Sequence, residues 1–431
     1  MSEQSASVTP VAAGQRTLPC ETEVEAATKA AFRFYQNPRV SRTQLSEPLL
    51  TLARESLSES CKSFALVAHD WSLVHLNDHE SKEDRIALSQ STDLGYKLQS
   101  ALLIGDRWGD PLAPVYLGLE AADGVHGSSF DQIEQPLSQL DNLAPVMAYL
   151  ERLGWHKPIV HIIDAEADSI AHFRHWSVAG HLFLVRADAR NTVEHDGETR
   201  SLRDVGKTLG PQLRLAREVE YHGKAAQQFV AETTVTIVRQ AQLQRQNEDG
   251  KKTRTYLSGP PLTLRLIVSE IRDEKGNVLA TWYLLTNAPC CAIAEVVALW
   301  YYWRWRIESY FKLLKGAGLQ LEHWQQETAE AFMRRLLVAS MACVQVWRLA
   351  RSTAPEAARA RSILIRLSGR QMKRGIEFTE PALLAGLWVY LAMMEILEHV
   401  NPQELKTLLE PIFPSPSPPP HNPPDGNLCP D

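Results

Sequence analysis

The chain has 431 residues, of which 44% are hydrophobic and 22% are charged, and its formal net charge at pH 7 is -6. This length and apolar content allow a large buried core and two or more structural units. The six cysteines form no C-x-x-C pair, which argues against a cysteine-based zinc site and a disulfide framework and favours the reducing cytoplasm.

The first part of the chain predicts helices followed by strands. We expect residues 1–20 to be disordered and residues 21–62 to form helices at 22–35 and 46–57. The segment 63–186 alternates strands and a helix, which are expected at 64–69, 96–105, 113–120, 142–153 (the helix) and 159–164. Three strands, a helix and a further strand predict a mixed α/β fold.

The second part begins with a β-rich segment at 187–288, whose strands are expected at 233–244, 262–272 and 279–286. This segment is longer than one crossover connection requires, so we interpret it as an insertion. A helix within 289–325 follows, and a helical region at 326–410 has helices expected at 327–352, 354–368 and 379–409. The Pro-rich segment 411–431 should be extended and unpacked.

No segment is expected to enter a membrane. The N-terminal residues carry no hydrophobic signal, and the longest apolar stretch late in the sequence, Ala382–Met394, is too short to span a bilayer. We therefore expect a soluble, cytoplasmic protein.

Two acids follow short apolar runs that predict buried strands. Asp70 comes two residues after the run 64–68, and Asp164 comes directly after the run 159–163. An acid just beyond such a strand lies at the rim of the sheet. A buried or half-buried carboxylate is costly unless it is paired or binds a cation, so both acids are candidate ligands.

A third acid, Glu308, belongs to a predicted helix with Tyr301, Arg304 and Lys315. At about 100° per residue their spacing keeps these four side chains within roughly a 60° arc of one helix face. The apolar stripe beside this face consists of Trp300, Ile307, Phe311 and Leu314. Arg and Glu four residues apart are also typical of a solvated ion pair. With the two strand-end acids, however, Glu308 would complete a set of hard oxygen ligands, which Mg²⁺ or Mn²⁺ prefers.

The segment from Tyr301 to Lys315 matches the signature Y-x2-R-x3-E-x6-K at every defined position. Through this motif, and through the segments 163–168 and 281–286, the chain resembles the DDE transposases of bacterial insertion sequences. Within that group it is similar to the insertion sequence 4 family, to which the transposase of transposon five belongs. The likeness covers roughly residues 60–350.

The resemblance implies a ribonuclease-H-like core with a β-rich insertion and a helical C-terminal region. Asp70, Asp164 and Glu308 would coordinate two divalent ions, Mg²⁺ or Mn²⁺, which stabilise the attacking and leaving oxygens of a phosphoryl transfer. The implied activity is cleavage of double-stranded DNA at transposon ends through a hairpin, followed by strand transfer into target DNA.

The resemblance also implies DNA contacts from six side chains, Tyr301, Arg304, Lys315, Lys312, Trp282 and Arg186. Arg304 and Lys315 would stabilise the charge of the transition state, and Trp282 would stack on a base flipped out of the hairpin. Three of the six have an ordinary alternative, because Lys312 also fits a solvating lysine, Trp282 a core tryptophan and Arg186 a strand-end arginine.

Relatives recognise transposon ends through an N-terminal helical domain, which is shortened here to residues 21–62. Their C-terminal region pairs two protomers, so we expect a homodimer on DNA. The stripe of Leu384, Leu387, Leu391 and Met394 could form that interface or an intramolecular core. From Arg348 to Arg374 there are eight Lys or Arg and one acid, which favours a phosphate-binding surface over a merely soluble helical face.

Three classes of function stay open at this point. The first is an active transposase. The second is a DNA-binding, dimerising relative that cannot transpose, acting as an inhibitor or derived from a decayed element. The third is a metal-dependent nuclease without strand transfer.

Overall fold

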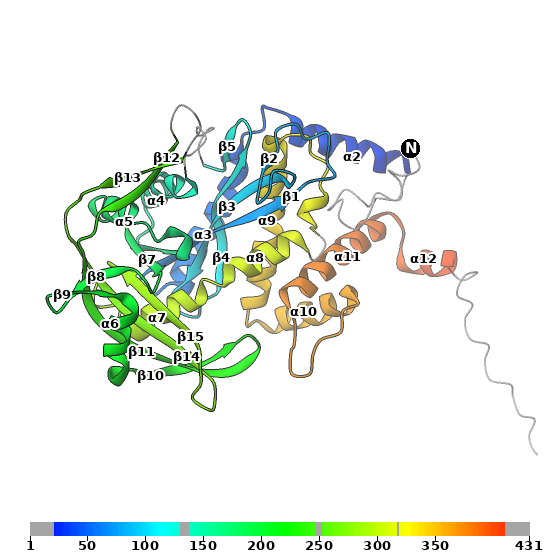
Figure 1. Cartoon of the computed structure of the whole chain (residues 1–431). Coiled ribbons are helices and arrows are strands. Elements are labelled where there is room, and N and C mark those ends of the chain that lie inside the picture. Colours follow the sequence, from blue (N-terminus) through cyan, green and yellow to red (C-terminus); the bar gives the residue numbers. More distant parts are fainter. Residues whose placement is uncertain (1–20, 130–137, 247–251, 317–318, 410–431) are drawn as a thin grey trace, which may run out of the picture.

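The computed structural model describes residues 21–129, 138–246, 252–316 and 319–409 (Figure 1). The segments 1–20 and 411–431, which were expected to be disordered and extended, lie outside these residues. Two helices open the described chain as expected, α2 (Glu21–Gln36) and α3 (Arg42–Ser60). The side chain of Ser41 caps α3 by accepting the backbone N–H of Gln44, because a helix start leaves its first N–H groups without partners.

Six strands and two helices form the next part of the chain: β1 (Ala65–His75), β2 (Ile86–Ala87), β3 (Leu94–Gly105), β4 (Pro111–Ala121), β5 (Gly124–Gly127), α4 (Leu143–Arg152), β6 (Ile159–Ile163) and α5 (Ile170–Val178). β1, β3, β4 and β5 form an antiparallel meander. On its other side β1 pairs in parallel with β6, which pairs in parallel with β7 (Leu182–Ala187). These elements confirm the predicted α/β class.

β1 is longer than the strand predicted at 64–69. It pairs with β6 only as far as His69, whereas its pairing with β3 continues to His75. Asp70 therefore lies within β1, at the point where the neighbour on one side ends, and not beyond the strand as predicted. Asp164 does follow its strand directly, as expected.

The β-rich character of 187–288 is confirmed, with more strands than the sequence indicated. They are β8 (Thr192–His195), β9 (Glu198–Ser201), β10 (Arg214–Tyr221), β11 (Lys224–Ile237), β12 (Ala241–Gln246), β13 (Lys252–Leu257), β14 (Leu262–Arg272) and β15 (Val278–Thr286). β15 pairs with β7, so most of these strands continue the sheet that contains β1. The sheet has 13 strands, in the order β5-β4-β3-β1-β6-β7-β15-β14-β11-β8-β9, with β2 beside β3 and β10 beside β11.

The signature segment is not the single helix that was predicted. It forms α7 (Ala294–Trp303) and α8 (Arg306–Lys315), which are separated at Arg304 and Trp305. The N–H groups of Arg304 and Ile307 bond to carbonyls three residues back, so the chain tightens into a 3₁₀-type turn at this point. The predicted apolar stripe is nevertheless buried, because each helix keeps its apolar side toward the core.

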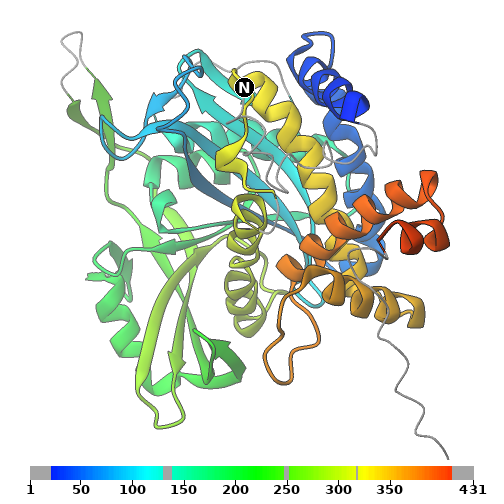
Figure 2. The ribbon, with the colours of Figure 1, turned by 90° about the vertical axis from the view of Figure 1, so that its right-hand side faces the viewer.

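The C-terminal helices are α9 (Ala329–Arg351), α10 (Pro355–Ser368), α11 (Glu380–His399) and α12 (Pro402–Leu409). The helix predicted at 379–409 is divided in two, because Pro402 has no N–H to continue α11 and instead begins α12. Figure 2 shows these helices gathered on one side of the molecule, away from the strands of 187–288, with α7 and α8 between the two groups.

Two hydrophobic clusters hold the described part of the chain together. The larger one packs β1, β3 and β4 against α3, α7, α8 and α9. The smaller one packs α5 and α6 (Leu202–Leu209) against β7, β14 and β15. The larger cluster holds α8 over β1 and β3, which is the packing that positions Glu308 above the sheet.

Of the described helices, α11 is the one that is long and apolar enough to cross a membrane. This differs from the sequence prediction, because the helix has 20 residues and so extends beyond the apolar stretch itself. Length and composition are weak evidence for a membrane span, since core helices of soluble proteins meet the same criteria. Ala382, Leu383 and Leu384 of α11 are fully buried.

We predict that Gly386→Ala destabilises the protein by about 1–3 kcal/mol, because overpacking a tight contact forces the backbone to move. A Cβ at this position would collide with the backbone carbonyl of Leu364 where α11 crosses α10. Denaturant unfolding measures the change. Val389→Ala, at an exposed position of the same helix, is the control and should leave stability almost unchanged. Equal stabilities of the Gly386→Ala protein and the wild type would contradict this packing.

Candidate functional site

Asp70 and Asp164 lie side by side because of the parallel pairing of β1 and β6. His69 is in register with Ile163, so the next residues along the two strands are Asp70 and Asp164. The backbone N–H of Trp71 donates to Asp70 Oδ1 over 2.9 Å, and the backbone N–H of Ala165 donates to Asp164 Oδ1. These local hydrogen bonds orient both carboxyl groups at the edge where β6 ends.

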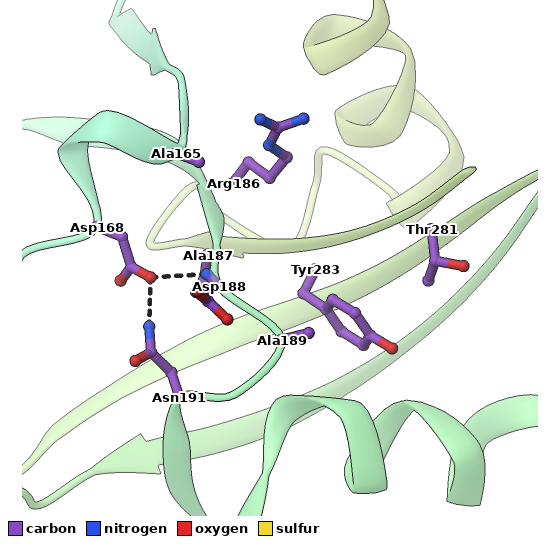
Figure 3. A pocket seen from close by; sticks show the side chains of 9 residues that line it. All are labelled: Ala165, Asp168, Arg186, Ala187, Asp188, Ala189, Asn191, Thr281 and Tyr283. Carbon is purple, nitrogen blue, oxygen red and sulfur yellow. Dashed lines mark hydrogen bonds between the residues drawn. The ribbon is translucent and has the colours of Figure 1, made fainter.

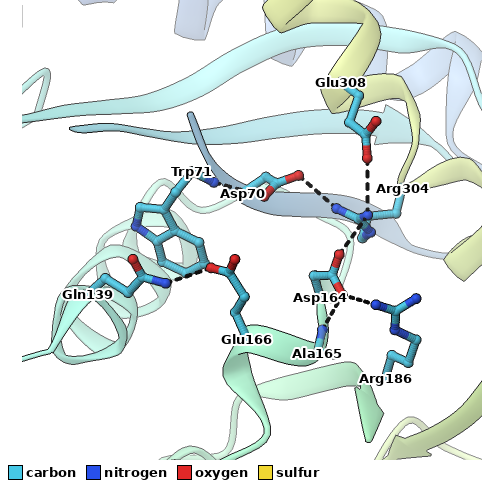
Figure 4. Close-up of polar contacts among 9 residues, drawn as sticks. All are labelled: Asp70, Trp71, Gln139, Asp164, Ala165, Glu166, Arg186, Arg304 and Glu308. Carbon is cyan, nitrogen blue, oxygen red and sulfur yellow. Dashed lines mark hydrogen bonds and ion pairs between the residues drawn. The ribbon is translucent and has the colours of Figure 1, made fainter. Parts of the chain in front are cut away.

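The guanidinium of Arg304 joins these two acids to Glu308 (Figure 4). Its Nη1 lies 2.7 Å from Asp70 Oδ2, and its Nη2 lies 2.9 Å from Asp164 Oδ2 and 3.4 Å from Glu308 Oε1. The Arg304 side chain is only 3% exposed. The structure therefore brings the three predicted acids together around one buried cation.

The tight turn between α7 and α8 explains how Arg304 reaches this position. In an unbroken helix Arg304 and Glu308 would be neighbours on one face, at the usual spacing of an ion pair. Here Arg304 stands at the break, with its guanidinium carbon 5.9 Å from the ring centroid of Tyr301 and 5.7 Å from that of Trp305. The four-residue spacing of Arg304 and Glu308 predicted their pairing. It did not predict that Arg304 also contacts Asp70 and Asp164.

A second arginine touches the same group of acids. Arg186, at the end of β7, places Nη2 2.9 Å from Asp164 Oδ1 and keeps 38% of its side chain exposed. Three carboxylates and two guanidinium groups leave this cluster with one net negative charge when all of them are ionised. The cluster thus keeps one uncompensated negative charge, and Arg186 is its most exposed side chain.

Burial changes the ionisation of the cluster. It raises the pKa of Asp70, an effect that the charge of Arg304 opposes and the charge of Asp164 strengthens. Burial also raises the pKa of Glu308, against the effect of Arg304 and with that of Asp70. Burial disfavours the charged form of Arg304, yet Tyr301 and the three acids outweigh it and raise the pKa of the guanidinium. Arg304 is therefore a permanent cation.

Tyr301 and Trp282 are in the core of this structure. Trp282 on β15 is 5% exposed, and its ring centroid lies 5.3 Å from that of Tyr301, edge to face. Burial raises the pKa of Tyr301 to about 12. A base could stack on Trp282 only after the side chains around it had moved, so its placement matches the ordinary alternative of a core tryptophan.

Lys315, which belongs to the signature, and Lys312, which lies between its defined positions, differ in their surroundings. Lys315 donates to the backbone carbonyl of Leu73 and lies 3.2 Å from Glu322 Oε1, so it ties α8 to the far end of β1. Lys312 is exposed one helical turn beyond Glu308, and its charge counteracts the rise in the pKa of that acid. Lys312 also borders a cavity of about 480 Å³, whose lining includes Trp305 and Ser309.

Beneath Asp70 lies a buried histidine pair that the sequence prediction missed. His69 Nε2 and His161 Nδ1 are 2.8 Å apart, and both rings are fully buried. Burial lowers the pKa of His69 to about 3, so the ring is neutral. The hydrogen bond joins β1 to β6 on the sheet face opposite Asp70 and supports the register that aligns Asp70 with Asp164. The signal in the sequence was a polar residue, His161, inside an apolar strand.

A cavity of about 550 Å³ opens beside Arg186 (Figure 3). Asp168 anchors its wall, since its Oδ2 accepts the backbone N–H of Asp188 over 2.7 Å and the side-chain amide of Asn191. Arg186 thus lies between the acidic cluster and this cavity. A negatively charged group in the cavity could reach Arg186 without entering the core.

The three acids fit a divalent metal by their chemistry, because they present carboxylate oxygens around a position that holds a cation. Among the described residues, no group of three or more His, Cys, Asp or Glu is arranged as a ready-made metal site. The guanidinium of Arg304 lies among the three carboxylates. The four described cysteines, Cys61, Cys290, Cys291 and Cys343, are free.

Comparisons with models of protein families and with curated proteins found no match to this chain.

We predict a pH-dependent loss of stability that comes from the cluster. The pKa values of Asp70 and Glu308 are raised above their ordinary 3.8 and 4.5, so the folded protein binds these protons more tightly than the unfolded chain. The free energy of unfolding should therefore fall as the pH rises from the ordinary pKa values of these acids to their raised pKa values in the folded protein. Glu308→Gln should reduce this fall and raise the unfolding temperature at pH 7 by about 1–2 °C.

Thermal unfolding between pH 3 and pH 8 measures this effect. Glu166→Gln is the matched control, because Glu166 is exposed beside the cluster and bonds to Gln139 rather than to Arg304. Identical pH profiles for the wild type and the Glu308→Gln protein would contradict the raised pKa of Glu308.

Proposed function

We propose that the chain is a DDE transposase of bacterial insertion sequences, of the insertion sequence 4 family, which cuts DNA at transposon ends and joins them to target DNA. The observation that carries this proposal is the gathering of Asp70, Asp164 and Glu308 around one cation. The three acids come from β1, from the end of β6 and from α8, and the signature Y-x2-R-x3-E-x6-K contains the third.

The strand order supports a ribonuclease-H-like core. β4, β3, β1, β6 and β7 are neighbours in that order, with β3 antiparallel to β1, and with β6 and β7 parallel to it. This is the meander followed by crossovers that such a core requires. One acid on the first strand and one at the end of the adjacent parallel strand are then next to each other, and a helix packed on the same face can add the third.

Asp70, Asp164 and Glu308 would hold the metal, two ions of Mg²⁺ or Mn²⁺. When bound, such ions supply Lewis-acid stabilisation of the attacking and leaving oxygens in phosphoryl transfer. The carboxyl groups come from three separate elements, so the packing of α8 on β1 and β3 sets their separation.

The arginines and lysines near the cluster would bind the DNA backbone. Arg186 is 38% exposed beside its cavity and pairs with Asp164, and Lys312 is exposed beside Glu308, so both side chains could contact phosphates from solvent. Arg304 and Tyr301 lie deeper, at 3% and 1% exposure, and would meet a phosphate only after a rearrangement. Lys315 holds β1 and α8 together and would act by positioning them.

The basic segment 348–374 would extend this surface. Its described side chains divide into two groups. Arg361 is buried and donates to the backbone carbonyls of Leu349 and Ser352, and Arg351 donates to that of Pro111. The exposed cations are Arg348, Arg359, Arg366, Arg370, Lys373 and Arg374. These six would bind phosphates and make DNA affinity depend strongly on salt.

The proposal includes a homodimer on DNA and a cytoplasmic location. Of the predicted interface stripe, Leu384 is buried in the core and Leu387 packs against it, whereas Leu391 and Met394 are 48% and 39% exposed. The outer half of α11 is thus the part that could meet a second protomer.

We predict that Glu308→Ala lowers DNA cleavage by at least about 10³-fold and leaves DNA affinity nearly unchanged, because the acid holds the metal and not the phosphates. Cleavage in Mg²⁺ of DNA that carries the element's own ends measures the first effect, and a gel-shift assay measures the second. Glu166→Ala is the control and should cut at the wild-type rate.

The products separate the three classes of function. Hairpin-tipped ends that later join target DNA support the transposase. DNA that is retarded but never cut would support a transposition-deficient binding protein instead, and unselective nicking would support a nuclease without strand transfer. A Glu308→Ala protein that still cuts would refute the assignment of this acid.

A further inference from the structure

Arg304 uses the same oxygen atoms that a metal would need. Its two terminal nitrogens contact Asp70 Oδ2, Asp164 Oδ2 and Glu308 Oε1 within 2.7, 2.9 and 3.4 Å. Its Nε is buried and makes no hydrogen bond within the described part of the chain. The ion pairs of the guanidinium are therefore all with these three acids, and the rings of Tyr301 and Trp305 lie 5.9 and 5.7 Å from its central carbon.

The charges of the cluster disfavour simultaneous binding of Arg304 and a divalent ion by the three acids. With Arg304 in place, the three acids, Arg304 and Arg186 sum to one negative charge, so a divalent ion would leave an excess positive charge in a buried site. Without Arg304 the remaining groups sum to two negative charges, which neutralise the first of the two proposed ions, and phosphates of the DNA would offset the second. Two cations competing for the same oxygens repel each other strongly where water is scarce.

The position of Arg304 in the chain would allow its guanidinium to leave the three acids for a phosphate. It stands at the break between α7 and α8, and its neighbour Trp305 is 43% exposed. The cavity of about 480 Å³ that is lined by Trp305 and Lys312 lies against the same turn. A phosphate drawn there by Lys312 would offer the guanidinium a new bidentate partner, which arginine binds well.

We propose that Arg304 is an internal counter-cation that blocks divalent metal from the three acids until a DNA phosphate draws it away. The metal and the DNA rest on the proposed function, whereas the blocking role rests on the contacts of Arg304. Metal loading would then be coupled to substrate binding, and the enzyme without DNA would hold its acids in a closed, inactive pairing.

The test is direct titration of Mn²⁺ into the full chain, followed by calorimetry and by the electron paramagnetic resonance signal of free Mn²⁺. Arg304→Gln should bind Mn²⁺ at least about tenfold more tightly than the wild type, because the competing cation is gone. Arg304→Lys should lie between them, since an ammonium cannot bridge three carboxylates as a guanidinium does.

Arg265→Gln is the matched control. Arg265 is also a buried arginine, but it pairs with Glu232 and with the backbone carbonyls of Ala288, Pro289 and Ala292. Its loss should lower stability without changing the affinity for Mn²⁺. A short DNA duplex should then tighten Mn²⁺ binding to the wild type and leave binding to the Arg304→Gln protein unchanged.

The outcomes separate this proposal from the proposed function. Equal Mn²⁺ affinities of the wild type, Arg304→Gln and Arg304→Lys would overturn the blocking role and leave the metal site intact. Failure of all of them to bind Mn²⁺, with or without DNA, would overturn both proposals. Should Arg304→Gln fail to fold, the comparison of Arg304→Lys with the wild type decides the matter in the same way.

Discussion

The contact of Arg304 with three carboxylates is the interaction on which the rest of the site depends. Each acid is carried by a different element, and none of them would be stable half-buried beside the others without a cation. The parallel register of β1 and β6 aligns the first two acids, and the packing of α8 brings the third. The position of the guanidinium among the acids thus depends on the strand register, on the packing of α8 and on the break between α7 and α8.

This arrangement is also under electrostatic strain. Burial raises the pKa of Asp70 and of Glu308 even with Arg304 present, so the fold tolerates these acids rather than gaining stability from them. Residues kept at a cost in stability are typical of functional sites. The buried pair of His69 and His161 carries no charge, and its one hydrogen bond joins the two strands beneath the acids.

Much of the fold was predictable from the sequence, because apolar runs and helical periodicity report burial directly. The three acids were found in the same way, from runs that end in a carboxylate and from the spacing of the signature. What could not be predicted depends on contacts between distant segments. β1 continues past Asp70 because β3 extends beyond β6, and Trp282 is in the core because Tyr301 packs on it. The break at Arg304 likewise follows from where α7 and α8 each pack, which no local pattern records.

The central claim, that positions 70, 164 and 308 form one cation site, is tested most directly by iron-directed cleavage of the chain. Fe²⁺ bound in place of the proposed Mg²⁺ would generate hydroxyl radicals with ascorbate and peroxide, and these would cut the backbone near the ion. A shared site predicts cuts close to all three acids in the DNA-bound protein, mapped by mass spectrometry and suppressed by excess Mg²⁺. Cuts near only one acid, or a pattern that Mg²⁺ does not change, would contradict it.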